Sequence, residues 1–236
     1  MVEFNEMTDS KIAAIVTQFV YPDDREIRVR KFAITLRALG YQVHVLCGSN
    51  GHNFDFIDQD GNIIHRINVC WQLPFIHRIL KASFPTNPIW YIWILLTCWK
   101  NKINFILVRD LRLSHPGLIA GKILGIPRII DFGEDFPSLY KIVGYSEILI
   151  KLSCWLEKLA INLADKVTVV SEESKQKLED DYVISPNKII TLPNVPAPSL
   201  VWDWGSTIPY ETFPNAKNEL KLICTKLLTF EMFTSL

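Results

Sequence analysis

The sequence predicts an α/β fold, in which an open and mostly parallel sheet carries helices on both faces. Three observations lead to this prediction. Short apolar runs recur along residues 11–196, as the buried strands of a parallel sheet do. Amphipathic segments with helical spacing separate these runs, and glycines or helix-capping residues mark their ends. Strand, helix and strand within about forty residues make a βαβ unit, which builds parallel sheets.

The first unit spans residues 11–47. The run KIAAIVTQF at 11–19 is nearly continuous in apolar residues and rich in β-branched ones, so it predicts a buried strand. Asp24 can cap the helix that follows. The apolar face of this helix recurs at i, i+3, i+4 and i+7 and comprises Val29, Phe32, Ala33 and Leu36. Gly40 ends the helix, and YQVHVLC at 41–47 is the next strand.

The segment 50–70 interrupts this pattern, and the alternation then resumes. Turn residues around short alternating runs predict a hairpin or an irregular pair of strands at 50–70. Strands are expected at 105–109, 126–131, 165–170 and 188–192, and helices at about 113–124, at about 146–164 and after Ser171. Residues 197–236 lose the pattern. We therefore expect one domain over 1–196 and an irregular tail over 197–236.

Composition narrows the class of protein. Lysine plus arginine and aspartate plus glutamate both number 25, so net charge gives no argument for nucleic acid as a partner. Between residues 61 and 130, however, nine basic residues accompany a single acid, Asp110. This stretch is either a surface for anionic membrane or phosphate, or a set of solvated charges spread over several elements. Five scattered cysteines without a C-x-x-C pair indicate reduced thiols in the cytosol, and no metal site is expected.

An aromatic-rich apolar run lies at residues 89–99, IWYIWILLTCW. Its eleven residues are too few to span a bilayer, which needs about 20. The run is either a core helix with aromatic ends or a segment that lies in a membrane interface. In the second case the membrane-surface residues are Trp90, Trp93, Trp99, Lys100 and Lys102.

Ligands of open α/β sheets bind at the carboxyl ends of the strands. Three strand-to-helix turns carry polar groups there: YPDDR at 21–25, DFGEDFP at 131–137 and VVSEES at 169–174. None of them contains G-x-G-x-x-G or G-x-x-x-x-G-K-[ST]. These absences disfavour a dinucleotide oxidoreductase and a P-loop NTPase.

Three ordered segments carry a resemblance to a known family. Asp24-Arg25 followed by a helix ending in RALGYQVHVL, then GKILGIPRIIDFGEDFPSL, and then ADKVTVVSEESKQKL with NKIITLPNVP are similar to family 4 glycosyltransferases. The resemblance implies the Rossmann-like N-terminal half of a GT-B fold, which holds the acceptor. It also implies sugar transfer with retention and without a metal.

The resemblance points to acceptor or cleft residues at matching positions: Asp24, Arg25, Arg28, Asp131, Glu134, Asp135, Ser171 and Asn194. Gly133 stands where the family has a histidine, so no catalytic residue is assigned. Other roles remain open for several of these residues. Glu134 and Asp135 suit the start of a helix, Arg25 and Arg28 suit a solvated helix face, and Ser171 suits a helix cap.

In the family a second domain binds the nucleotide-sugar, which is a co-substrate, so no cofactor is expected. Only about forty residues follow Pro196, too few for such a domain, and a truncated or frame-shifted gene is one hypothesis. We expect a cytoplasmic glycosyltransferase half, peripheral to the inner membrane face, with a glycan or lipid-linked acceptor and a separately encoded donor half. The alternative is an inactive remnant that binds only acceptor or membrane.

Overall fold

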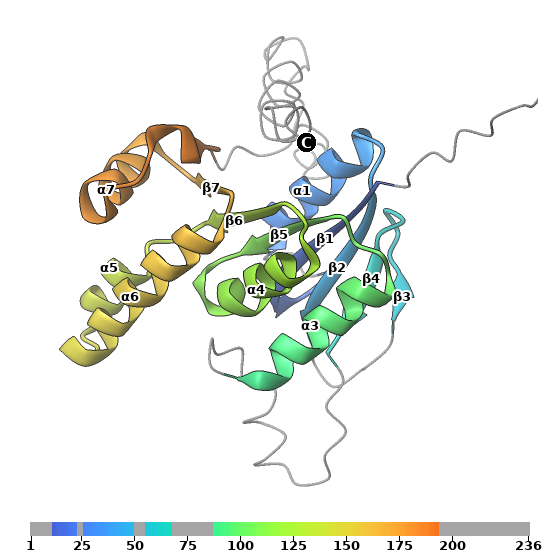
Figure 1. The fold of residues 1–236 in the computed structure, drawn as a ribbon, viewed down its shortest axis with the longest axis horizontal. Coiled ribbons are helices and arrows are strands. Elements are labelled where there is room, and N and C mark those ends of the chain that lie inside the picture. The colour runs from blue at the N-terminus through green and yellow to red at the C-terminus, as the bar shows by residue number, and fades with distance from the viewer. Residues whose placement is uncertain (1–10, 23–25, 50–54, 68–86, 194–236) are drawn as a thin grey trace, which may run out of the picture.

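The computed structural model describes residues 11–22, 26–49, 55–67 and 87–193 (Figure 1). Within them, strands form one sheet in the order β3-β4-β2-β1-β5-β6-β7-β8. Neighbouring strands are parallel except for the antiparallel pair β3 and β4. The open, mostly parallel α/β sheet predicted from the sequence is therefore confirmed.

The elements follow the predicted alternation closely. The strands are β1 (Ile12–Val20), β2 (Gln42–Gly48), β3 (Phe56–Ile57), β4 (Ile63–Arg66), β5 (Phe105–Arg109), β6 (Arg128–Phe132), β7 (Lys166–Val169) and β8 (Ile189–Thr191). The α-helices are α1 (Ile27–Ala38), α3 (Pro88–Lys100), α4 (Ser114–Leu124), α5 (Phe136–Val143), α6 (Glu147–Leu163) and α7 (Glu172–Tyr182). Two short 3-10 turns, η2 (Leu111–Leu113) and η3 (Pro186–Lys188), precede α4 and β8.

The register of the central strands brings their carboxyl ends to one edge of the sheet. Val16 of β1 is level with Val108 of β5, which is level with Ile130 of β6, which in turn pairs with Val167 of β7. The residues that follow these positions therefore meet at the same edge. This is the edge at which α/β sheets bind ligands.

Helices cover both faces of the sheet, as predicted. Alternate residues of a strand point to opposite faces, and Ala13 and Ile15 of β1 belong to one core cluster while Ala14 and Val16 belong to another. The first cluster is closed by α1, and the second by α3, α4 and α6. Figure 1 shows α3 and α4 in front of the sheet with α1 on its other side.

The aromatic run of residues 89–99 forms α3. Asn87 caps this helix by accepting a hydrogen bond from the backbone N–H of Ile89 at 3.2 Å. Trp90, Ile94 and Cys98 lie one helical turn apart and are buried. One side of the run therefore belongs to the core, as the interpretation of a core helix requires. Within the described residues, no helix has both the length and the apolarity to cross a bilayer.

Helix α5 follows the DFGEDFP turn, where a helix start at Glu134 and Asp135 was one interpretation but no bounds for a helix were predicted. Asp135 caps it by accepting a hydrogen bond from Ser138 N at 3.0 Å, and Gly144 ends it with a φ of 81°. Phe136, Leu139, Tyr140 and Val143 lie at i, i+3, i+4 and i+7, so the sequence does carry an apolar face at helical spacing, although only Phe136 and Pro137 are buried. The hairpin expected over 50–70 is confirmed for Phe56–Ile57 and Ile63–Arg66, and β4 also extends the sheet by pairing with β2.

Candidate functional site

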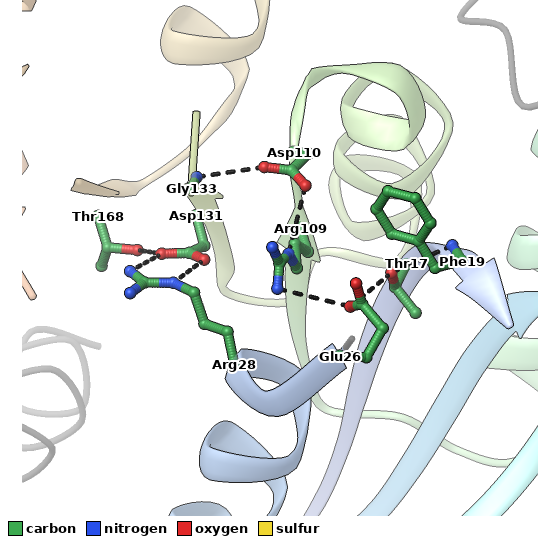
Figure 2. A network of polar contacts seen from close by, with 9 residues as sticks. All are labelled: Thr17, Phe19, Glu26, Arg28, Arg109, Asp110, Asp131, Gly133 and Thr168. Carbon is green, nitrogen blue, oxygen red and sulfur yellow. Dashed lines mark hydrogen bonds and ion pairs between the residues drawn. The ribbon is translucent and has the colours of Figure 1, made fainter. Parts of the chain in front are cut away.

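A buried ion pair joins α1 to the carboxyl end of β6. Arg28 donates from Nε and Nη2 to the two carboxylate oxygens of Asp131, each at 2.6 Å (Figure 2). Thr168 of β7 donates its hydroxyl to Asp131 Oδ1 at 2.6 Å, and Arg28 Nη1 donates to the carbonyl of Leu192 at 3.2 Å. The Asp131 side chain is 0% exposed and that of Arg28 is 6% exposed. The pair therefore fixes the start of α1 against the central strands.

A second polar chain runs beside this pair, from β1 to the turn after β6. Thr17 donates to Glu26 Oε2 at 3.3 Å, and Arg109 Nη1 lies 3.5 Å from the same oxygen (Figure 2). Arg109 Nε donates to Asp110 Oδ2 at 3.2 Å, and Asp110 Oδ1 accepts from Gly133 N at 3.2 Å. Burial raises the pKa of Asp110, and the Arg109 guanidinium counteracts only part of that effect.

The backbone of Asp110 is strained. Its φ of 62° and ψ of 168° lie in a region that is essentially restricted to glycine and costs about 1–3 kcal/mol. The conformation is held because Asp110 N donates to the carbonyl of Asp131 at 2.9 Å while its carboxylate accepts from Gly133 N. Strain of this kind clusters at functional sites, so it marks this edge as the candidate site.

Gly133 lies directly against this chain. A Cβ placed on it would be 3.3 Å from both Arg109 Nη2 and Asp110 Oδ1, closer than ordinary van der Waals contact. Arg109 and Asp110 thus occupy part of the space that a side chain at position 133 would need. A side chain at position 133, where the resemblance implies a histidine, would require Arg109 and Asp110 to shift slightly.

A cavity of about 280 Å³ opens at the carboxyl ends of β6 and β7, between those strands and helices α5, α6 and α7. This volume is near the lower end for small-molecule sites. Its lining is rich in carboxylates and includes Glu134, Asp135, Glu157, Glu173 and Lys177. Several converging polar groups in a concave site are typical of a binding pocket.

Two of the lining carboxyl groups are perturbed in opposite directions. Burial raises the pKa of Glu157 to about 7, although Glu157 accepts a hydrogen bond from the Tyr182 hydroxyl at 2.6 Å, which lowers it. Burial also raises the pKa of Asp135, but hydrogen bonds from Lys177 and Ser138 outweigh it and leave the pKa below its usual value. The cavity therefore presents an ionised Asp135 beside a Glu157 whose pKa lies near neutral pH.

The structure brings several of the candidate residues together. Asp131 lies in β6 and Glu134 and Asp135 follow it, and Glu134 is exposed and lines the cavity. Arg28 is buried in its pair with Asp131, so the interpretation of a solvated helix-face charge is wrong for this residue. Ser171 accepts from Ser174 N at 3.2 Å and caps α7. Asp24, Arg25 and Asn194 lie outside the described residues.

The proposed membrane-surface residues divide between core and surface. Trp90 is buried and Trp93 is half-buried, whereas Trp99, Lys100 and Lys102 are exposed.

Several residues of the polar network and of the cavity were not predicted from the sequence. Glu26, Arg109, Thr168, Glu157 and Lys177 were not singled out. Arg109 has a sequence signal that could have found it, because it ends a buried strand and precedes the single acid of residues 61–130. Glu157 has no such signal, since its burial depends on how α6 packs. Within the described residues, no cluster of three or more His, Cys, Asp or Glu side chains is arranged to hold a metal ion.

The strand order and the edge where the polar groups meet define a Rossmann-like domain of the GT-B type. The chain belongs to Glycosyltransferase Family 4, whose family model matches residues 26–195. This confirms the resemblance found in the sequence. No curated protein sequence matches the chain.

Solved structures support the same fold. Sucrose-phosphate synthase from Thermosynechococcus elongatus is similar with a TM-score of 0.59 at 14% identity, over 78% of this chain and 48% of that protein. UGT71G1 from Medicago truncatula, complexed with UDP-glucose, is similar with a TM-score of 0.52 at 12% identity, over 78% of this chain and 52% of that protein. A UDP-N-acetylglucosamine 2-epimerase is similar with a TM-score of 0.52 at 13% identity, over 77% of this chain and 48% of that protein. These likenesses show the fold alone, and the chain spans about half the length of each of these proteins.

Proposed function

We propose that this chain is the acceptor-binding half of a glycosyltransferase, which transfers a sugar from a nucleotide-sugar to a glycan or lipid-linked acceptor. Membership of family 4 supports the reaction class. The observation that carries the proposal is the carboxylate-lined cavity at the carboxyl ends of β6 and β7. The nucleotide-sugar binds to a second domain or a separately encoded half, and the protein works in the cytoplasm at the inner membrane face.

The chemistry of the cavity suits a sugar better than a phosphate. Sugar hydroxyls both donate and accept hydrogen bonds, and the carboxylates of Glu134 and Glu173 are strong acceptors. Glu157, with a pKa of about 7, can donate or accept. Lys177 is already engaged with Asp135 and Ser138, so it offers little free positive charge. A phosphate would face several carboxylates here, whereas a sugar hydroxyl would find partners.

A second candidate function is binding without turnover, and Gly133 favours it. Glycine can neither hydrogen-bond the transferred sugar nor exchange a proton, as a histidine at this position can. The carboxylate of Asp110 accepts hydrogen bonds from Arg109 and Gly133, and Arg109 forms an ion pair with Glu26 at 3.5 Å. The two candidates share the same acceptor site and differ only in whether transfer follows.

Sugar binding to the cavity tests the proposal directly. Saturation-transfer NMR with glucose, galactose and N-acetylglucosamine is expected to show binding that Glu134→Gln and Glu173→Gln weaken by at least about tenfold each, since a charged hydrogen-bond acceptor contributes about 1.5–3 kcal/mol. Asp180→Asn is the matched control, because Asp180 is an exposed acid of α7 outside the cavity lining. Equal loss in the control, or none in either cavity variant, would refute the assignment.

Calorimetry with UDP-, GDP- and ADP-sugars tests where the donor binds. The expected result for this chain alone is no tight binding. Tight binding would contradict the placement of the donor site outside this domain. If sugars bind the cavity and radiolabelled transfer is absent even with a complementing donor half, the function is binding without turnover.

A further inference from the structure

Exposed apolar side chains gather on one helical hairpin, formed by α5, the turn at Gly144 and α6. Eight of the sixteen large apolar side chains that are exposed within the described residues belong to it: Leu139, Ile142, Val143, Tyr145, Ile148, Leu149, Leu152 and Trp155. We call this set the hairpin surface. Ile142 is 82% exposed and Ile148 is 78% exposed, so these are not side chains at the margin of the core. Large exposed apolar patches on soluble proteins mark interaction sites.

The two sides of α6 explain why the surface is left uncovered. One side buries Ser153, Glu157, Ala160 and Ile161 against the domain. The outward residues Ile148, Leu149, Leu152 and Trp155 recur at i, i+1, i+4 and i+7, so they share a second apolar side. A solvated helix would carry polar groups there. Figure 1 shows α5 and α6 side by side, extending away from the sheet.

The charges on this hairpin have one predominant sign. Lys141, Lys151 and Lys158 are exposed, and Glu147 is the single exposed acid of α5 and α6. Tyr145 and Trp155 add the aromatic side chains that favour the boundary between lipid headgroups and acyl chains. Helix α7, by contrast, is acidic, with Glu172, Glu173, Asp180 and Asp181 exposed. An anionic surface would therefore attract the hairpin and repel α7, which fixes an orientation.

We infer that the hairpin surface docks onto an anionic lipid bilayer, with its apolar side chains in the interface and its lysines at the headgroups. The cavity lies at the base of the same hairpin, because Asp135 begins α5 and Glu157 lies on the inner side of α6. Docking thus holds the cavity on the inner side of α6, about the thickness of one helix from the bilayer. The inference deepens the proposed function, on which it rests for the reaction, by selecting the lipid-linked class of acceptor over a soluble glycan.

Helix α3 provides a matched comparison. It also exposes apolar side chains, Ile92, Leu96 and Trp99, at 59%, 55% and 69%. They recur on the side opposite Trp90, Ile94 and Cys98, which are buried. The membrane contact lies on α5 and α6 and not on this helix.

Vesicle flotation tests the docking without any sugar. The chain is mixed with vesicles of phosphatidylcholine alone or of phosphatidylcholine with phosphatidylglycerol, and is expected to float with the anionic vesicles. The triple variant Ile142→Ser, Ile148→Ser and Trp155→Ser is expected to bind them at least about tenfold more weakly. The variant Lys141→Gln with Lys151→Gln is expected to lose about fivefold per lysine, and added salt should mimic it. The control Ile92→Ser with Leu96→Ser is expected to float like the wild type.

Each contrary outcome overturns the inference. Failure of the wild type to float with anionic vesicles would do so, as would undiminished flotation of the triple variant or a loss confined to the α3 control. If the wild type self-associates without lipid, does not float, and becomes monomeric in the triple variant, the hairpin surface is a protein interface. Far-ultraviolet circular dichroism verifies that each variant is folded. Because no sugar is present, failure here leaves the acceptor assignment standing, and loss of sugar binding leaves the docking standing.

Discussion

Removing Arg28 from its pair with Asp131 is expected to lower the free energy of unfolding by about 3–5 kcal/mol, the usual cost of leaving a buried charge unpaired. The perturbation is Arg28→Met, which retains much of the apolar stem and removes the guanidinium. It leaves the Asp131 carboxylate with the Thr168 hydroxyl at 2.6 Å as its remaining side-chain donor among the bonds described above.

The magnitude follows from the burial of the pair. The Asp131 side chain is 0% exposed, so water cannot replace the two hydrogen bonds of 2.6 Å that the variant removes. The exposed pair Arg30 and Asp60 is the matched control. Its atoms lie 3.1 Å apart, but the side chains are 46% and 31% exposed, so Arg30→Met is expected to cost less than about 1 kcal/mol.

Urea unfolding of four proteins forms the assay: wild type, Arg28→Met, Asp131→Asn and the double variant. The double variant is expected to be more stable than the sum of the single losses implies, by about 1–3 kcal/mol, because it leaves no unpaired charge. A loss below about 1 kcal/mol for Arg28→Met, or strict additivity in the cycle, would refute the reasoning.

Two further stability predictions follow from buried groups. The pKa of Glu157 is raised from 4.5 to about 7 in the folded chain, so its contribution to stability is full below about pH 4.5 and is lost as pH rises to about 7, by at most about 3 kcal/mol. Glu157→Gln is expected to remove this slope and Glu173→Gln to retain it, as measured by urea unfolding from pH 5 to pH 8. Burial lowers the pKa of His44 to about 4, so its contribution to stability rises with pH, opposite to that of Glu157. Each variant is therefore compared with the wild type at the same pH, which cancels the His44 contribution. A Cβ on Gly117 would lie 2.5 Å from Val108 Cγ2, so Gly117→Ala is expected to cost about 1–3 kcal/mol in wild type and much less in a Val108→Ala background. An equal cost in both backgrounds would show that this contact is not the cause.

The sequence was sufficient for most of the fold because the information is local. Strands such as Phe105–Arg109 are short buried runs, and α1 buries side chains at helical spacing. Each of these patterns can be recognised within about a dozen residues. Helix α5 also has apolar residues at helical spacing, but it is only eight residues long and follows directly on the DFGEDFP turn, so the pattern is too short to identify it.

The turn after β6 shows how far the sequence determines the site. The segment DFGEDFP lies at the end of a predicted strand, and this was sufficient to select Asp131, Glu134 and Asp135 as candidate site residues. The sequence alone also shows that residue 133 is a glycine. By itself the sequence also determined the family, since three ordered motifs are matters of residue identity and spacing. It determined that the apolar run at 89–99 is too short to cross a bilayer.

Only the tertiary structure decided what those residues touch. Arg28 and Asp131 are 103 positions apart in the chain, and their pairing depends on α1 crossing to the carboxyl end of β6. The same holds for the burial that raises the pKa of Glu157 and for the outward apolar side of the α5–α6 hairpin. Burial and long-range pairing are properties of how elements pack against one another. Periodicity within one element indicates which side is apolar, but not whether the domain covers it.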